Sequence, residues 1–184
     1  MKKIIAVFAI IAVLIGCFAA CSGGKEGNSQ NGELFDSFET IDFEGNTVNE
    51  KVFKGKKVTM LNIWGTFCSP CIREMPALNT LNETYADKGL QVIGIVCDVP
   101  LEENGKPNES KLNEAKEILR IREAEYMNIF PFEEMYSTVL AGSYSVPVTY
   151  FVDENGKQIG ESYLGSKDLE AWQKIVDSVL AQVE

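Results

Sequence analysis

The sequence has no histidine among its 184 residues, and this absence narrows the kinds of site that it can form. A structural zinc site typically needs four ligands, which are cysteine and histidine side chains. Only three of the five cysteines lie outside the first 21 residues. We therefore expect no zinc site, and no copper site of the kind that combines cysteines with a histidine.

Positive charge is also scarce. Lysine and arginine together number 17 against 27 aspartates and glutamates, which gives a formal net charge of −10 at pH 7. Nucleic acids and anionic lipid headgroups are negatively charged, so an acidic protein surface repels both. We expect no nucleic-acid ligand, and any attachment to a membrane has to come from a lipid rather than from the protein surface.

The N-terminal segment has the pattern of a secretory signal. Two lysines precede an apolar stretch at residues 4–15, and small residues then lead to a cysteine twice, at Cys17 and at Cys21. A cysteine after small residues at this place is typical of a bacterial lipoprotein signal. An uncleaved membrane helix over residues 4–20 is the alternative, because this segment is almost long enough to span a bilayer.

Of the two cysteines, Cys21 is the better lipidation site. The residues after it are rich in glycine, serine and asparagine, a composition that forms a flexible tether. Cleavage before Cys17 would instead leave the apolar Phe18 at the new terminus. We predict a signal peptide at residues 1–20, a tether at 21–33 and a single domain at 34–184.

The domain alternates strand and helix patterns. Residues 57–64 and 90–98 are apolar runs without strict alternation, as in strands that are buried on both faces. Between them, apolar residues recur every three or four positions over residues 72–85, and Gly89 follows as a stop signal. This strand, helix, strand order predicts two parallel neighbouring strands.

Weaker signals complete the pattern. We expect an exposed loop at 98–111 and a tight turn at Asn155-Gly156 between two strands. The other predicted elements are a small hairpin with a short helix at 38–56, helices around 112–122 and 132–142, and a last helix that opens at Ser166.

Cys68 and Cys71 are separated by two residues, in the segment "WGTFCSPCIREMP". A structural disulfide is one interpretation, since exported proteins carry disulfides. A disulfide that closes so short a loop constrains the unfolded chain little, however, so the spacing favours a reactive pair. Proline is favoured at the start of a helix, so Ser69-Pro70 predicts that Cys68 is the helix N-cap. There the helix dipole stabilises its thiolate, which would attack a substrate disulfide, and Cys71 would resolve the mixed disulfide.

This segment resembles the active site of the thioredoxin superfamily, in particular the TlpA/ResA-like membrane-tethered thiol-disulfide oxidoreductases. Trp64, Pro76, Gly165 and the segment "SVPVTYFVD" extend the resemblance over about residues 34–183. It implies an α/β, thioredoxin-like fold with a central mixed β-sheet flanked by helices and an N-terminal β-hairpin extension. It also implies a cis peptide bond between Val146 and Pro147, where the backbone of Val146 would pair with a substrate strand.

The resemblance also assigns roles to single residues. Asn62 stands where cytoplasmic thioredoxins carry a buried aspartate, so Glu74 is the candidate carboxylate, on the same helical face as Cys71. An exposed glutamate without a role is the alternative. The residues expected to contact substrate are Trp64, Phe67, Ser69, Pro70, Val146 and Pro147.

The implied function is that of an extracytoplasmic, lipid-anchored reductase of disulfides in exported proteins, which is recharged by a membrane electron donor of the CcdA/DsbD kind. Because the dipeptide Ser69-Pro70 has no histidine cation, we expect a reducing dithiol. Apocytochrome c and surface methionine sulfoxide reductases are both candidate substrates. We expect a monomer that needs no metal or organic cofactor.

Two other functions remain open at this point. The first is a redox-inactive binding lipoprotein that keeps the fold. The second is a thiol peroxidase that uses Cys97 as a resolving thiol. The peroxidase motif wants a threonine or serine three residues before the reactive cysteine, and Gly65 stands there instead. Cys97 is therefore better interpreted as a small core residue.

Overall fold

The computed structural model describes residues 35, 37–102, 105–140 and 145–183. They belong to one compact unit that spans residues 31–184. Within these ranges no helix combines the length and the apolar character needed to cross a membrane. The predicted signal peptide, the predicted lipidation site Cys21 and the predicted tether lie outside the described residues.

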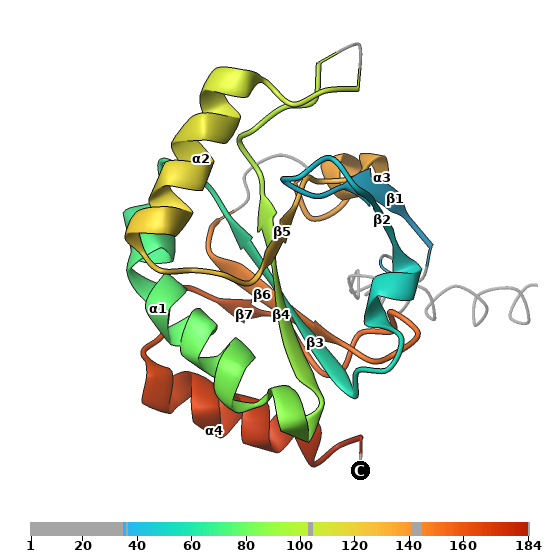
Figure 1. Cartoon of the computed structure of the whole chain (residues 1–184). Helices are drawn as coiled ribbons and strands as arrows, with labels where there is room; N and C mark the ends of the chain where they lie inside the picture. The colour runs from blue at the N-terminus through green and yellow to red at the C-terminus, as the bar shows by residue number, and fades with distance from the viewer. Residues whose placement is uncertain (1–34, 36, 103–104, 141–144, 184) are drawn as a thin grey trace, which may run out of the picture. The chain divides into compact units, whose positions relative to one another are not determined.

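The fold is built on a five-stranded mixed sheet, as predicted (Figure 1). The central strand β3 is parallel to β4 and antiparallel to β6, while β5 extends the β4 side and β7 extends the β6 side. The strand order is β5-β4-β3-β6-β7, with bounds Met127–Ile129, Leu90–Val96, Val58–Trp64, Val148–Val152 and Tyr163–Leu164.

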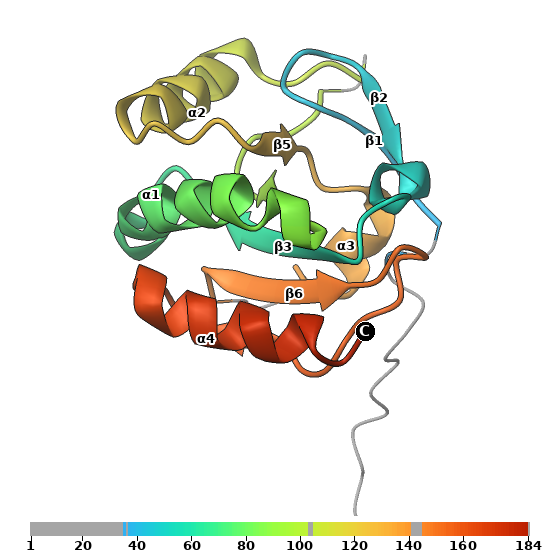
Figure 2. The same cartoon turned by 60° about the horizontal axis from the view of Figure 1, so that its bottom comes forward.

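In the described part of the chain four α-helices flank this sheet: α1 Ser69–Thr84, α2 Glu109–Ile121, α3 Glu133–Ser137 and α4 Leu169–Leu180. Helices α1 and α4 lie side by side along one face of the sheet (Figure 2). The buried apolar residues of α1, α2 and α4 belong to one cluster, and Met135 of α3 and most buried apolar residues of the N-terminal segment belong to another. The sheet therefore has a covered core on each face, which explains why every residue of β3 is buried.

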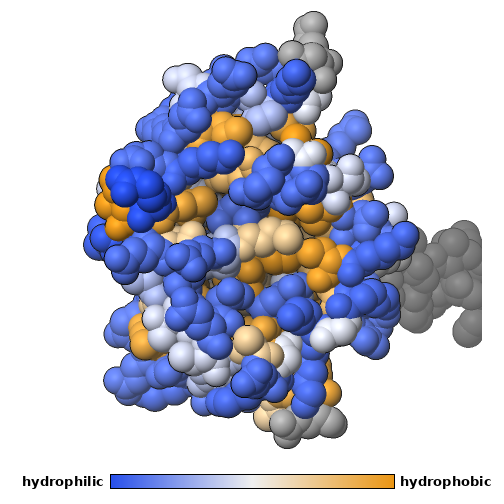
Figure 3. All heavy atoms as spheres, viewed as in Figure 1, coloured by the Kyte–Doolittle hydropathy of each residue, from blue (hydrophilic) through white to orange (hydrophobic). Residues whose placement is uncertain are grey.

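Strand β3 shows how the sequence produces this arrangement. Successive side chains of a strand point to opposite faces. Met60 and Trp64 accordingly join the cluster under α1, while Leu61 and Ile63 join the cluster on the other face. In the space-filling view of Figure 3, hydrophilic residues cover most of the visible face and hydrophobic residues show mainly between the elements.

Both predicted hairpins are present. The N-terminal hairpin pairs β1, Glu39–Ile41, with β2, Thr47–Asn49, and a short 3-10 helix, Glu50–Phe53, follows it. At the second hairpin, the Gly156 N–H donates to the Asp153 carbonyl at 3.0 Å, and Gly156 adopts a positive φ of 78°. A positive φ suits glycine, so the Asn-Gly signal located this turn correctly.

Two boundaries and the exposure of one loop differ from the predictions. The loop expected at 98–111 ends earlier, because the Asn108 side chain caps α2 by accepting a hydrogen bond from the Lys111 N–H. The loop is also not wholly exposed, since Val99 is buried. The last helix begins after Asp168 rather than at Ser166, because the Asp168 carboxylate caps it through the Ala171 N–H.

Candidate active site

The two cysteines lie at the start of α1, where they form a disulfide in this structure. Cys68 is the N-cap, as predicted, and its Sγ accepts a hydrogen bond from the Cys71 N–H at 3.2 Å. Amide donors at the first turn of a helix favour a negative charge at this position. In the reduced protein the same geometry stabilises a thiolate on Cys68 more than on Cys71, which lies one turn inside the helix.

The loop before Cys68 is fixed by a residue that sequence reasoning missed. Asp98, just after β4, accepts hydrogen bonds from the Thr66 N–H at 2.9 Å and from the Thr66 hydroxyl at 2.6 Å. The Cys68 N–H donates to the Gly65 carbonyl at 3.0 Å. The position of Asp98 at the carboxyl end of a parallel strand was the available signal, because functional side chains gather at that edge.

Gly65 stands where the peroxidase pattern has a threonine or serine. A Cβ atom at this position would lie 2.6 Å from the ring of Phe67, so a side chain there would require this ring to turn away. Phe67 itself is 64% exposed, beside the attacking cysteine.

The peptide bond between Val146 and Pro147 is cis, as the family resemblance implied. The pairing of Ile63 with Val148 places Pro147 beside the end of β3, from which the loop leads to Cys68. The Pro147 carbonyl accepts a hydrogen bond from the Gly165 N–H at 2.8 Å. The cis-proline segment and the Cys68 loop therefore leave the sheet at the same edge.

The residues predicted to contact substrate do not all reach the surface. Phe67 and Ser69 are exposed, and Pro70 and Val146 are partly exposed. Trp64 has no exposed surface and donates its indole N–H to the Asn128 side-chain oxygen at 2.9 Å. Because a buried ring offers no surface to a substrate, the contact predicted for Trp64 is wrong in this structure, and its place is beneath the site.

Pro147 is also buried, which counts against the substrate contact predicted for its side chain, and Val146 is the partly exposed residue beside it. Cys97 is partly buried against the second apolar cluster and lies outside the disulfide, in agreement with a core residue. Its N–H donates to the Trp64 carbonyl at 2.8 Å, which continues the pairing between the ends of β3 and β4.

Glu74 is a buried carboxylate with three hydrogen-bond donors. Its side chain is on α1 one turn after Cys71, and the residue is only 3% exposed. One oxygen, Oε1, accepts from the Asn62 amide at 3.1 Å. The other, Oε2, accepts from the Lys167 N–H at 3.0 Å and from the Trp172 indole N–H at 3.2 Å. The interpretation of Glu74 as an exposed helix residue is therefore excluded.

The environment of Glu74 shifts its protonation equilibrium. Burial raises the pKa of the carboxyl above its usual value, because the charged form loses solvation. The hydrogen bonds from Lys167, Asn62 and Trp172, and the charge of Lys167, act in the opposite direction and limit this rise in pKa. A carboxyl with a raised pKa is suited to exchange protons near neutral pH.

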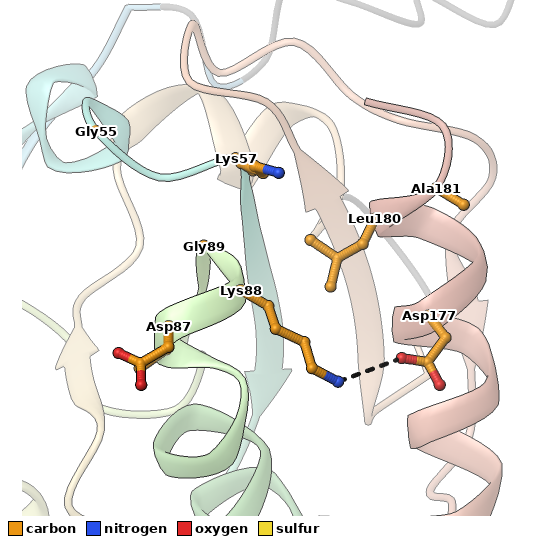
Figure 4. Close-up of a pocket in the computed structure, with 9 residues that line it drawn as sticks. Gly55, Lys57, Asp87, Lys88, Gly89, Asp177, Leu180 and Ala181 are labelled. Atoms are coloured by element: carbon orange, nitrogen blue, oxygen red, sulfur yellow. Dashed lines mark ion pairs between the residues drawn. The ribbon is translucent and has the colours of Figure 1, made fainter. Parts of the chain in front are cut away.

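A cavity of about 670 Å³ lies away from these residues (Figure 4). It is lined by Lys57 and Gly89, which precede β3 and β4, and by Lys88, which pairs with Asp177 of α4 at 4.0 Å. These residues are at the amino ends of the parallel strands, whereas Cys68 follows the carboxyl end of β3. The cavity is therefore not part of the candidate active site.

Comparison with known proteins agrees with this geometry. The model of the AhpC/TSA family matches residues 32–161. The thiol-disulfide oxidoreductase ResA of Bacillus cereus (strain ZK / E33L) is 31% identical over 179 residues, which cover 92% of this chain and 94% of the relative.

Two solved structures share the fold. A thioredoxin family thiol:disulfide interchange protein from Chlorobium tepidum TLS has a TM-score of 0.62 at 20% identity, over 78% of this chain and 93% of that one. The exposed lipoprotein thioredoxin Etrx1 of Streptococcus pneumoniae strain TIGR4 has a TM-score of 0.60 at 20% identity, over 77% and 98%. The chain thus belongs to the AhpC/TSA family of thioredoxin-fold proteins and, within it, is a thiol-disulfide oxidoreductase of the ResA type.

Proposed function

We propose that this oxidoreductase reduces disulfides in exported proteins, on the outer face of the cytoplasmic membrane, to which a lipid on Cys21 holds it. The observation that carries the reductive direction is the dipeptide Ser69-Pro70, because it adds no cation to the stabilisation that the helix N-cap already gives the Cys68 thiolate. The lipoprotein pattern of the sequence supports the location, as does the word "lipoprotein" in the name of the pneumococcal structural neighbour.

The reaction transfers two electrons from the dithiol to the substrate. The Cys68 thiolate attacks one sulfur of the substrate disulfide, a bond forms between them, and the second substrate sulfur leaves as a thiolate. Cys71 then loses its proton and attacks the Cys68 sulfur, which releases the first substrate sulfur as a thiolate and leaves the Cys68–Cys71 disulfide. A membrane dithiol donor of the CcdA/DsbD kind would reduce this disulfide again.

Glu74 is the proposed acceptor for the proton of Cys71. The two residues are three positions apart on α1 and both are buried, so they share the inner face of the helix. The raised pKa of Glu74 supports the role, because it makes the buried carboxylate a stronger base than an exposed glutamate. No metal or organic cofactor takes part in this scheme.

Substrate recognition is proposed to use the exposed rim of the site. Phe67 and Ser69 offer side-chain contacts, and the Val146 backbone offers hydrogen bonds to an extended segment of an oxidised protein. Apocytochrome c and surface methionine sulfoxide reductases are the proposed substrates. The protein is proposed to act as a monomer.

The alternative is a binding lipoprotein that keeps the fold but has no redox activity. Reduction of insulin by dithiothreitol separates the two functions, with Cys68→Ser as the matched control. We expect the wild-type protein to accelerate insulin reduction and Cys68→Ser to match the reductant alone. Equal rates for wild type and Cys68→Ser would refute the reductase function.

A further inference from the structure

The C-terminal part of the chain supplies both donors to one oxygen of Glu74. Lys167 and Trp172 are 93 and 98 residues away from Glu74 in the sequence, yet both donate to its Oε2. The N–H of Lys167 comes from the segment before α4, and the indole comes from the first turns of α4 itself. The carboxylate on the active-site helix is thus held by a different element of the fold.

Trp172 is a fixed donor. It has no exposed surface, and its ring packs against Phe151 and Tyr163 with centroid distances of 6.4 and 6.1 Å. An indole N–H can only donate a hydrogen bond, and its bond to Glu74 is the one that the structure gives it. Because a donor interacts more strongly with a charged acceptor, Trp172 favours the ionised form of Glu74.

Lys167 places a positive charge near the same carboxylate. Its ammonium lies 4.8 Å from the centre of the Trp172 ring and donates to the carbonyls of Leu164 and Gly165, at 3.2 and 3.0 Å. The Gly165 N–H in turn donates to the Pro147 carbonyl. The Lys167 ammonium is thereby held near the Trp172 ring by a segment that also contacts the cis-proline residue.

We propose that Trp172 and Lys167 are positioning residues that hold the Glu74 carboxylate ionised and in place, one helical turn from Cys71. This inference rests on the proposed role of Glu74 as the proton acceptor. Trp172 and Lys167 touch neither the reacting sulfurs nor the substrate in this scheme. They act through Glu74, so their effect is on the pH range in which the mixed disulfide is resolved.

Other polar and titratable groups also face Glu74. From β3, the neutral Asn62 amide donates to Oε1 and also to the Thr149 hydroxyl of β6 at 3.0 Å. Before β5, the buried Tyr126 phenol has a pKa raised first by burial and then by the charge of Glu74. On α1 itself the titratable neighbour is Cys71. Of these groups, only Lys167 carries a positive charge.

The test is Trp172→Phe in the full-length protein, because phenylalanine keeps an aromatic ring at this buried position and removes the N–H donor together with part of the indole. Tyr163→Phe is the matched control, since Tyr163 belongs to the same ring cluster without donating to Glu74. The Glu74 pKa is read directly from the pH dependence of its side-chain ¹³C shift by NMR. Single-turnover release of a substrate from the mixed disulfide is measured over the same pH range.

We expect Trp172→Phe to raise the Glu74 pKa by about one unit and to slow release about tenfold on the acid side of the profile. The rate of first attack by Cys68 should not change. A second variant, Lys167→Met, keeps the backbone donor and should shift the pKa in the same direction by less, while Lys174→Met on the exposed face of α4 should not shift it.

The outcomes separate two failures. If Glu74→Gln releases substrate at the wild-type rate at every pH, the proposed role of Glu74 fails. If Glu74→Gln slows release but Trp172→Phe and Lys167→Met leave the Glu74 pKa unchanged, only the positioning role of these two residues is overturned. If Trp172→Phe does not fold, the Glu74 pKa measured by NMR in Lys167→Met still tests the positioning role: an unchanged pKa overturns it.

Discussion

Replacing Glu74 should destabilise the oxidised protein, and the loss should depend on whether the new side chain can still accept the hydrogen bonds that Glu74 accepts. In Glu74→Ala, the Lys167 N–H and the Trp172 indole lose the acceptor that they share, while Asn62 keeps its bond to Thr149. A buried donor without an acceptor costs about 1–3 kcal/mol, and the Trp172 indole is buried while the Lys167 N–H is partly buried, so the free energy of unfolding should fall by at least about 1–3 kcal/mol.

Glu74→Gln should cost much less. Its amide oxygen can take the place of Oε2 and accept from both donors, while its amide nitrogen would face the Asn62 amide nitrogen. Rotation of the Asn62 amide by half a turn removes this conflict, because the Thr149 hydroxyl can then donate instead of accept. We expect Glu74→Gln to lower the stability at pH 7 by less than about 1.5 kcal/mol.

The two variants should also differ in pH dependence. The pKa of Glu74 is raised by burial in the folded protein, so its contribution to stability is fully present below the pKa of the unfolded chain. That contribution is lost as the pH rises through the folded pKa, because the folded protein then holds a buried charge. Glutamine carries no charge, so its stability does not change in this way with pH. The free energy of unfolding of Glu74→Gln, relative to that of the wild type, should therefore be higher at pH 7 than at pH 4.

Urea denaturation of the oxidised protein, followed by tryptophan fluorescence at several pH values, measures both effects. The reasoning would be refuted if Glu74→Ala and Glu74→Gln were equally stable at pH 7. It would also be refuted if the difference between Glu74→Gln and wild type did not change with pH, since the carboxyl would then have the same pKa in the folded and unfolded states.

Three further predictions concern other parts of the chain. Asp98→Ala removes both acceptors of Thr66 and should slow attack on a small disulfide roughly tenfold, measured by stopped flow, because the loop before the attacking cysteine loses its anchor. Phe67→Ala should change the free energy of unfolding by less than about 0.5 kcal/mol but reduce kcat/KM for insulin; an unchanged kcat/KM would remove Phe67 from the substrate contacts. Palmitate labelling in cells should be lost in Cys21→Ala and kept in Cys17→Ala, and the opposite pattern would move the anchor to Cys17.

Much of the scaffold could be predicted because its signals are local or periodic. The apolar runs that became β3 and β4 are buried on both faces, and this alone makes a strand uniformly apolar. The position of Cys68 at the N-cap followed from Ser69-Pro70, since proline suits the first turn of a helix.

The parts that were missed depend on contacts between distant residues. Strand β5 has only three residues, and its pairing with β4 defines it more than its composition does. The last helix was predicted, but not that the indole N–H of its Trp172 points at Glu74. The role of Asp98 was hidden in the same way, because its partner Thr66 is 32 residues earlier.

The central claim is that Cys68 attacks and Cys71 resolves, and covalent trapping tests it most directly. Cys71→Ser keeps the attacking thiolate at the helix N-cap and removes the resolving thiol, so an oxidised substrate should stay bound to Cys68 as a mixed disulfide. Cys68→Ser should trap nothing, and Cys97→Ser should behave like wild type. The adducts are resolved on non-reducing gels and mapped by mass spectrometry. Equal trapping by Cys71→Ser and Cys68→Ser, or an adduct on Cys97, would contradict the account.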